Sequence, residues 1–234
     1  MRRRKVFGQI SAPAVDKPRL TGHASTSMDA SLHQHLSAQD RPVILLEGTR
    51  KLPSQAHGQL RALTAWLCAE FPRAVFRSGN AEGTDAVFAD AVAACDPARL
   101  ELVLPHEGMG RKRRPPGARC VALKAMSDAD LTRVVAVTRQ AGRDAGRLGD
   151  YYLAHRNGPS SAATSKATYL LRDTLKVTGS EALGLAPAAL GIFFVNDADP
   201  TGGGTGHTIR VCEVLGVPVA TQAEWGSWTF GVGA

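Results

Sequence analysis

The sequence predicts an α/β fold, in which a doubly wound, mostly parallel sheet carries helices on both faces. Short apolar runs of strand length alternate with longer segments of helical periodicity over residues 42–220. The runs are apolar throughout, which is typical of strands that are buried on both faces. Each strand–helix–strand spacing also fits a crossover between parallel neighbours. These observations together predict a Rossmann-like domain.

The first half of this domain is the most regular part of the sequence. Strands are expected at residues 42–48, 73–77 and 100–104. Apolar side chains recur at helical spacing between the first two strands, at Leu60, Leu63, Leu67 and Phe71. Pro72 ends this helix. Residues 78–85 form a turn that leads into the next helix.

The second half is less regular, and residues 106–165 are a poorly assigned insertion or loop region. A basic, proline-rich loop is expected at 108–117, a helix at 128–140 and a break in that helix at 142–149. Further along the chain, the pattern predicts a helix at 160–178, a strand at 188–195, a helix at 205–215 and a short strand at 217–220.

Residues 1–40 are polar and lack sustained periodicity, so we expect a flexible basic tail with a short helix near residues 28–36. A single α/β domain then covers residues 41–234. Trp225, Trp228 and Phe230 near its end are expected in core or interface packing rather than in base stacking.

The formal net charge of the 234 residues is +7, which favours anionic partners such as nucleotides or nucleic acid. Much of the excess lies in residues 2–5 and 111–114. These segments are either solvated loops or contacts for a nucleic-acid backbone. No apolar run approaches the roughly 20 residues that cross a bilayer, so no membrane partner is expected.

The cysteines are isolated from one another and from histidine at zinc-ligand spacing, so no metal site is expected. They are Cys68, Cys95, Cys120 and Cys212. Cys68 and Cys212 fall in apolar helical patterns and are expected as buried thiols. This usage suits a reducing cytoplasm.

Ligands of doubly wound sheets bind beyond the carboxyl ends of the strands. Small and hydroxyl-bearing residues follow three predicted strands at this edge, where backbone N–H groups and a helix dipole favour an anion. The predicted ligand- and phosphate-binding residues are Gly48, Thr49, Arg50, Ser78, Gly79, Asn80, Gly83, Thr84, Asp85, Gly202, Gly203, Gly204, Thr205 and Gly206. The alternative is that these segments are structural turns.

The order of these motifs resembles the SLOG superfamily, which includes DprA-like DNA-processing proteins, YspA/YpsA-like proteins and LOG-like phosphoribohydrolases. Residues 48–50 are similar to the superfamily's Gly-Ser/Thr-Arg, and residues 78–85 to its Gly-Gly-Ala-x-Gly-x-Asp. Residues 201–205 and 216–219 are similar to its late Pro-Gly-Gly-x-Gly-Thr and Gly-Ile-Pro-Val. The resemblance implies a nucleotide-binding domain and, by analogy, a homodimer.

The LOG-like enzymes are expected to use a glutamate three positions after the threonine of the glycine motif, and an arginine on a preceding helix. This sequence has Thr208 at the first position and Arg172 as the counterpart of the second. Arg172 and His207 are therefore the catalytic candidates. Without a carboxylate at position 208, the acid/base role at an N-glycosidic bond lacks its usual residue.

The function that these patterns favour is binding of a nucleotide or nucleotide-derived phosphorylated small molecule, as a sensor or carrier and without a further cofactor. One alternative is hydrolysis of nucleoside 5′-monophosphates, and another is DprA-like binding of single-stranded DNA. Glu47, inside the first strand, is a buried carboxylate that needs a partner, and Arg50 or Arg77 are the expected ones.

Overall fold

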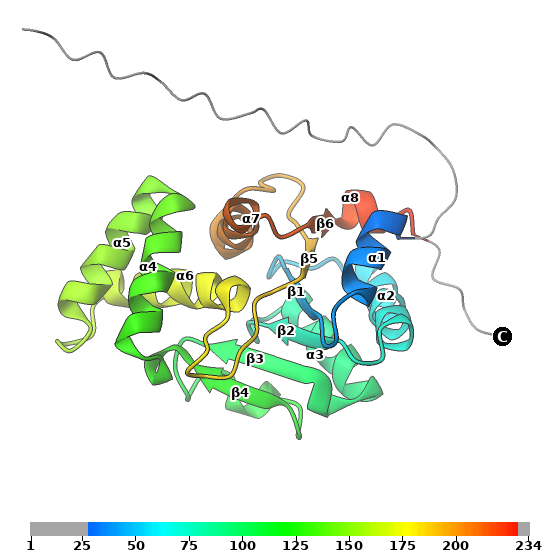
Figure 1. Ribbon diagram of the computed structural model, residues 1–234, viewed down its shortest axis with the longest axis horizontal. Helices are drawn as coiled ribbons and strands as arrows, with labels where there is room; N and C mark the ends of the chain where they lie inside the picture. The colour runs from blue at the N-terminus through cyan, green and yellow to red at the C-terminus, as the bar shows by residue number, and fades with distance from the viewer. Residues whose placement is uncertain (1–27, 229–234) are drawn as a thin grey trace, which may run out of the picture.

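The computed structural model describes residues 28–228 and places a six-stranded, all-parallel sheet at the centre of the protein (Figure 1). The strand order is β4-β3-β2-β1-β5-β6. The strands are β1 (Val43–Gly48), β2 (Val75–Ser78), β3 (Leu100–Leu104), β4 (Arg119–Ala122), β5 (Leu190–Phe194) and β6 (Val219–Thr221). The predicted α/β, Rossmann-like class is confirmed.

The chain reverses its direction across the sheet between β1 and β5. From β1 it moves outward through β2, β3 and β4, and it returns on the other side of β1 as β5 and β6. Gly48 pairs with Phe194, so β1 and β5 end at the same level. A doubly wound sheet opens its ligand crevice at such a switch point.

Helices cover both faces of the sheet (Figure 1). They are α1 (Ala30–Ser37), α2 (Ala56–Glu70), α3 (Thr84–Cys95), α4 (Asp128–Gln140), α5 (Arg143–His155), α6 (Ala162–Thr178), α7 (Gly203–Leu215) and α8 (Gln222–Trp225). Ile44 and Leu46 of β1 pack into the core with α1, α2 and α3, whereas Leu45 packs on the α6 and α7 side. This alternation follows from the two-residue period of a strand.

The folded part of the chain includes the end of the predicted tail. Helix α1 matches the short helix expected near residues 28–36, and its Leu36 is fully buried, as is most of Met28. The remainder of the predicted tail lies outside the described residues, as does Phe230. Trp225 is fully buried and donates from Nε1 to the Phe193 carbonyl at 2.9 Å, which confirms its expected core packing.

Two elements of the 106–165 region differ from the prediction. Strand β4 lies at the sheet edge, and its first residues are exposed, so it lacks the apolar pattern of the inner strands. The predicted break after residue 140 is confirmed at Gly142, which lies between α4 and α5, but its extension to 149 is wrong, because α5 runs from Arg143 to His155. Gly146 and Gly149 face α4 there, and a Cβ on Gly146 would lie 2.8 Å from Arg139 Cγ. These glycines allow close helix packing rather than ending a helix.

Between residues 28 and 228, no helix is both long and apolar enough to cross a membrane. The same residues contain no cluster of three or more histidine, cysteine or acidic side chains that could hold a metal ion. Cys68 and Cys212 are buried as expected, whereas Cys95 and Cys120 are exposed.

Candidate ligand-binding site

A cavity of about 600 Å³ opens at the switch point between β1 and β5. Its walls come from the turn after β1, the start of α3, the inner face of α6 and the segment that leads into α7. This volume is typical of sites for small molecules and cofactors.

The turn after β1 is held in a fixed conformation beside β5. Thr49 donates its backbone N–H to the Phe194 carbonyl at 2.8 Å, and a Cβ on Gly48 would lie only 2.3 Å from that same oxygen. Position 48 therefore requires glycine. Arg50, the next residue after Thr49, has an exposed side chain and lines the cavity.

Thr84 and Asp85, at the start of α3, clamp this turn. Thr84 Oγ1 donates to the Thr49 carbonyl at 2.9 Å. The Asp85 carboxylate accepts backbone N–H groups from Gly48 and Ala81, each at 3.2 Å. These two predicted binding residues act mainly on the shape of the cavity wall, and only Asp85 reaches its lining.

The α7 N-terminus forms the opposite wall. Gly202 is its N-cap residue, and no side chain caps the helix. Gly203 has a φ of +59° and no heavy atom within 4 Å of where its Cβ would be, so the backbone is open there. Residues 202–205 all line the cavity. The first N–H groups and the dipole of a helix favour an anion at such a position.

A buried charge cluster, formed by Glu47, Arg172, Asp173 and Lys176, makes up the floor of the cavity. Lys176 Nζ lies 2.5 Å from Glu47 Oε1 and 2.8 Å from Asp173 Oδ1. Arg172 contacts Asp173 Oδ1 at 3.2 Å and donates to the Gly79 carbonyl at 2.9 Å. The predicted partners of Glu47, Arg50 and Arg77, are wrong, because Lys176 occupies that place.

The two carboxylates of the cluster have opposite pKa shifts. Burial raises the pKa of Glu47 to about 7, and Asp85 and Asp173 add to this effect against the attraction of Lys176. Burial also disfavours the charge of Asp173, but Arg172 and Lys176 outweigh it and lower the pKa of Asp173. Near neutral pH, Glu47 is thus the group of this pair that exchanges a proton.

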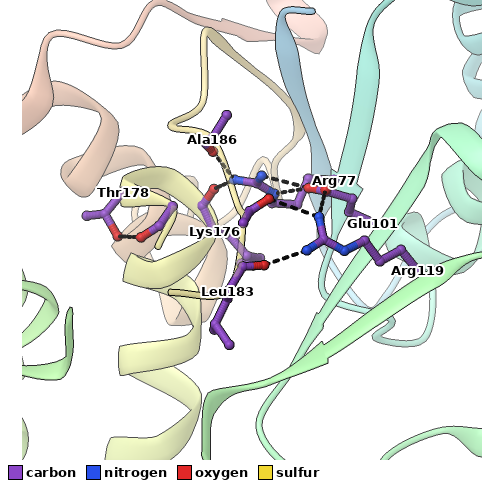
Figure 2. Close-up of polar contacts among 9 residues, drawn as sticks. Arg77, Glu101, Arg119, Lys176, Thr178, Leu183 and Ala186 are labelled. Carbon is purple, nitrogen blue, oxygen red and sulfur yellow. Dashed lines mark hydrogen bonds and ion pairs between the residues drawn. The ribbon is translucent and has the colours of Figure 1, made fainter. Parts of the chain in front are cut away.

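Arg77 instead anchors the C-terminal end of α6 to the sheet (Figure 2). Its side chain is fully buried, and Nη1 donates to the carbonyls of Lys176 and Ala186, each at 2.8 Å. Its Nε and Nη2 bind Glu101, which also pairs with Arg119 at 2.8 Å. This network fixes the backbone of the residue whose ammonium group reaches Glu47.

The structure brings most of the predicted site residues to one cavity. Those that line it are Gly48, Thr49, Arg50, Asp85, Arg172, Gly202, Gly203, Gly204 and Thr205. Those that lie behind the lining are Ser78, Gly79, Asn80, Gly83, Thr84, Gly206 and His207.

His207 is fully buried and hydrogen-bonds through Nε2 to Thr174 Oγ1 at 3.0 Å. Burial lowers its pKa, so the ring is neutral near pH 7. This position gives it no contact with the cavity, and its predicted catalytic role stays a prediction without geometric support. Arg172 does line the cavity, although its charge is largely matched by Asp173.

Apart from Arg172, the residues that α6 contributes to the cavity were not predicted from the sequence. Lys166, Tyr169, Asp173 and Lys176 all line the cavity, and none of them was predicted to. No clear signal for them is present in the sequence, because at 3.6 residues per turn positions 172 and 176 fall on the side of the helix opposite its apolar face, where charged residues are ordinarily solvated. Their burial is seen only in the folded structure, where Arg172, Asp173 and Lys176 are all buried.

The basic loop at 111–114 lies apart from this cavity and is partly engaged by the protein itself. Arg113 pairs with Glu82 at 2.7 Å, and Arg114 donates from Nη2 to the Met109 carbonyl at 2.7 Å. Within residues 28–228, Arg111 and Lys112 are exposed and have no ion-pair partner.

The fold is that of a Rossmann-like α/β protein, with a crevice at its switch point that is lined by both charged and apolar groups. No protein-family profile matches the chain, and no curated protein sequence matches it. Among solved structures, the chain is similar to the single-stranded-DNA-binding DNA processing protein A from Helicobacter pylori. The TM-score is 0.45 and the identity 13%, over 87% of this chain and 79% of that one. Similarity at this level carries no argument about ligand or activity.

Proposed function

We propose that the cavity binds a nucleotide or nucleotide-derived phosphorylated small molecule, as a sensor or carrier. The observation that carries this proposal is that the uncapped N-terminus of α7 and the turn after β1 face the same cavity at the switch point. Two of the three glycine-containing segments line the cavity, and the third, residues 78–85, reaches it through Ala81 and Asp85.

Two cations at the mouth of the cavity fit the phosphate, whereas the exposed Asp199 carboxylate beside Gly202 opposes it. Arg50 and Lys166 line the cavity with exposed side chains, and neither has an ion-pair partner among residues 28–228. Arg172 is less suited, because Asp173 and the Gly79 carbonyl already bind its guanidinium. In this proposal the phosphate contacts the backbone N–H groups near Gly203 and Thr205, together with Arg50 and Lys166.

Asp173 decides where along α7 the phosphate sits. A Cβ on Gly204 would lie 2.8 Å from Asp173 Oδ2, so this carboxylate approaches the backbone of α7 from the inner side. A phosphate would be repelled there. We therefore place it toward the mouth of the cavity, with the sugar and base directed inward and toward the turn after β1.

A thermal-shift screen of nucleoside mono- and diphosphates tests this proposal. A ligand at one hundred times its Kd stabilises the folded state by about 2.7 kcal/mol, which raises Tm by about 5–10 °C for a domain of this size. Arg50→Ala and Lys166→Ala should each reduce the shift. Arg61→Ala, which removes an exposed arginine from α2, is the matched control and should not. A screen without any shift would contradict the proposal.

A second candidate function, hydrolysis of a nucleoside 5′-monophosphate, is favoured by one contact. Thr208, which stands where the LOG-like enzymes are expected to have glutamate, lies with Oγ1 3.3 Å from Glu47 Oε2 and 3.0 Å from the Gly204 carbonyl, and these two acceptors share its single proton. Glu47 thus brings a carboxyl group to the position that α7 lacks, and a pKa of about 7 suits a general acid or base. Release of free base from a monophosphate, lost in Glu47→Gln, is the expected result. If no free base appears, the cavity only binds.

A further inference from the structure

The floor of the cavity combines hydrogen-bond donors and acceptors that the protein does not satisfy by itself. An ammonium group has three N–H donors, and Lys176 Nζ forms ion pairs with only two oxygen atoms, Glu47 Oε1 at 2.5 Å and Asp173 Oδ1 at 2.8 Å. Arg172 Nε is buried and has no acceptor within the described part of the chain. Arg172, Asp173 and Lys176 belong to α6, and Glu47 belongs to β1. All four side chains line the cavity.

The acceptors of the floor are also incompletely used. A carboxylate has about four lone-pair sites. Glu47 meets Lys176 through Oε1 and Thr208 through Oε2, and Asp173 meets both of its cationic neighbours through Oδ1 alone. Buried polar groups without partners cost free energy, so this floor is suited to a ligand that supplies both donors and acceptors.

Hydroxyl groups have this dual character, because each donates one hydrogen bond and accepts others. A vicinal diol matches a carboxylate and an ammonium group placed side by side, as Glu47 and Lys176 are. We infer that the charged floor binds the two ring hydroxyls of a ribose, so that the cavity selects ribonucleotides over 2′-deoxyribonucleotides. This inference rests on the proposed binding function and names the class of ligand.

The arrangement of the cavity agrees with this assignment. The phosphate position lies at the mouth, near Arg50 and Lys166, and the diol position lies at the buried end of the same cavity. Glu47 is held from α6 by Lys176 and from α7 by Thr208, and Asp85 of α3 adds negative charge nearby. Since Lys176 and Thr208 belong to two different helices, they hold Glu47 in place before a ligand arrives.

The test is a pair of calorimetric titrations of the wild-type protein, with a ribonucleoside 5′-monophosphate and with its 2′-deoxy counterpart. A site that hydrogen-bonds a substrate hydroxyl through charged groups is expected to bind the deoxy compound roughly 10–100-fold more weakly. Equal affinity for the two compounds would overturn the inference and leave the proposed function standing. Absence of binding by both would overturn the proposed function and the inference together.

A conservative variant tests the role of Glu47. Glu47→Gln keeps the size of the side chain, and it should weaken binding of the ribonucleotide while leaving the affinity for the deoxy compound within about threefold, so that the ratio of the two affinities falls toward one. Glu70→Gln, at an exposed carboxylate of α2, is the matched control and should keep the ratio. An unchanged ratio in Glu47→Gln would overturn the assignment. The ratio is measured within one variant, so a loss of stability does not mimic the effect.

Discussion

Lys176 Nζ lies 2.5 Å from Glu47 Oε1 and thereby joins the end of α6 to the carboxyl end of β1. Both side chains are almost fully buried, and they come from residues far apart in the sequence. The contact places a protonatable carboxyl group beneath the uncapped start of α7. The contact therefore joins β1 of the sheet to α6, and both of its side chains line the cavity that is proposed to bind the ligand.

We expect Lys176→Met to destabilise the protein strongly. The variant leaves Glu47 and Asp173 buried without their shared cation, and breaking a buried pair in this way costs about 3–5 kcal/mol. Arg73→Ala, which removes an exposed ion pair with Asp40, should change the free energy of unfolding by less than about 1 kcal/mol. Urea denaturation of both variants measures the difference. Similar values for the two would show that the buried cluster contributes no more than a surface pair.

Two glycine-to-alanine variants should have opposite effects on stability. A Cβ on Gly79 would lie 1.8 Å from Arg172 Nη1, so Gly79→Ala displaces the guanidinium and costs about 1–3 kcal/mol. Gly58 lies within α2 with nothing within 4 Å of its Cβ position, so Gly58→Ala should stabilise the protein by roughly 0.5–1 kcal/mol. Thermal unfolding reports both. A stable Gly79→Ala protein would mean that Arg172 has another place to go.

The stability of the protein should depend on pH through Glu47. Its pKa rises from 4.5 in the unfolded chain to about 7 in the fold, so the folded state holds this proton more tightly. The stabilisation from protonated Glu47 is complete below pH 4.5 and is lost as the pH rises through 7. Relative to Glu47→Gln, which does not titrate, the wild type should lose roughly 3 kcal/mol across this window. A difference between the two proteins that is independent of pH would contradict the shifted pKa.

Any binding of single-stranded DNA should depend on the free cations of the basic loop. If Arg111 and Lys112 each contact one phosphate, replacing both with glutamine should reduce the slope of log affinity against log salt by about 1.4. Arg61→Gln serves as a control at another exposed arginine. Fluorescence anisotropy with labelled oligonucleotides gives these slopes. An unchanged slope would place the contacts elsewhere, and nucleotide binding in the cavity should be the same in all these variants.

The inner strands can be predicted from the sequence, because a short run that is apolar throughout is typical of a strand buried on both faces. The sequence does not predict β4, since an exposed edge strand containing Arg119 and Cys120 lacks that pattern. From the sequence alone, Gly146 and Gly149 are expected to interrupt a helix. They instead allow α5 to lie close to α4, and only the packing of the two helices shows this role.

Some parts of the candidate site can likewise be predicted from the sequence, and others cannot. The turn after β1 and the start of α7 can be predicted, because glycine and hydroxyl residues at strand ends have a local physical meaning. The partner of Glu47 cannot be predicted locally, since Arg77, Arg50 and Lys176 are all cations that a fold could bring to it. The structure decides for Lys176, because Arg77 pairs instead with Glu101 on the neighbouring strand.

In the proposed complex, the N-terminus of α7 binds the phosphate of a nucleotide-like ligand. The decisive measurement is calorimetric titration of the wild-type protein with nucleoside 5′-monophosphates and with the corresponding nucleosides. The predicted result is saturable binding of at least one monophosphate at a single site, with an affinity at least tenfold above that of its nucleoside, and loss of this advantage in the Arg50→Ala, Lys166→Ala double variant. Equal affinity for nucleotide and nucleoside, or no saturable binding by any monophosphate, would contradict the claim.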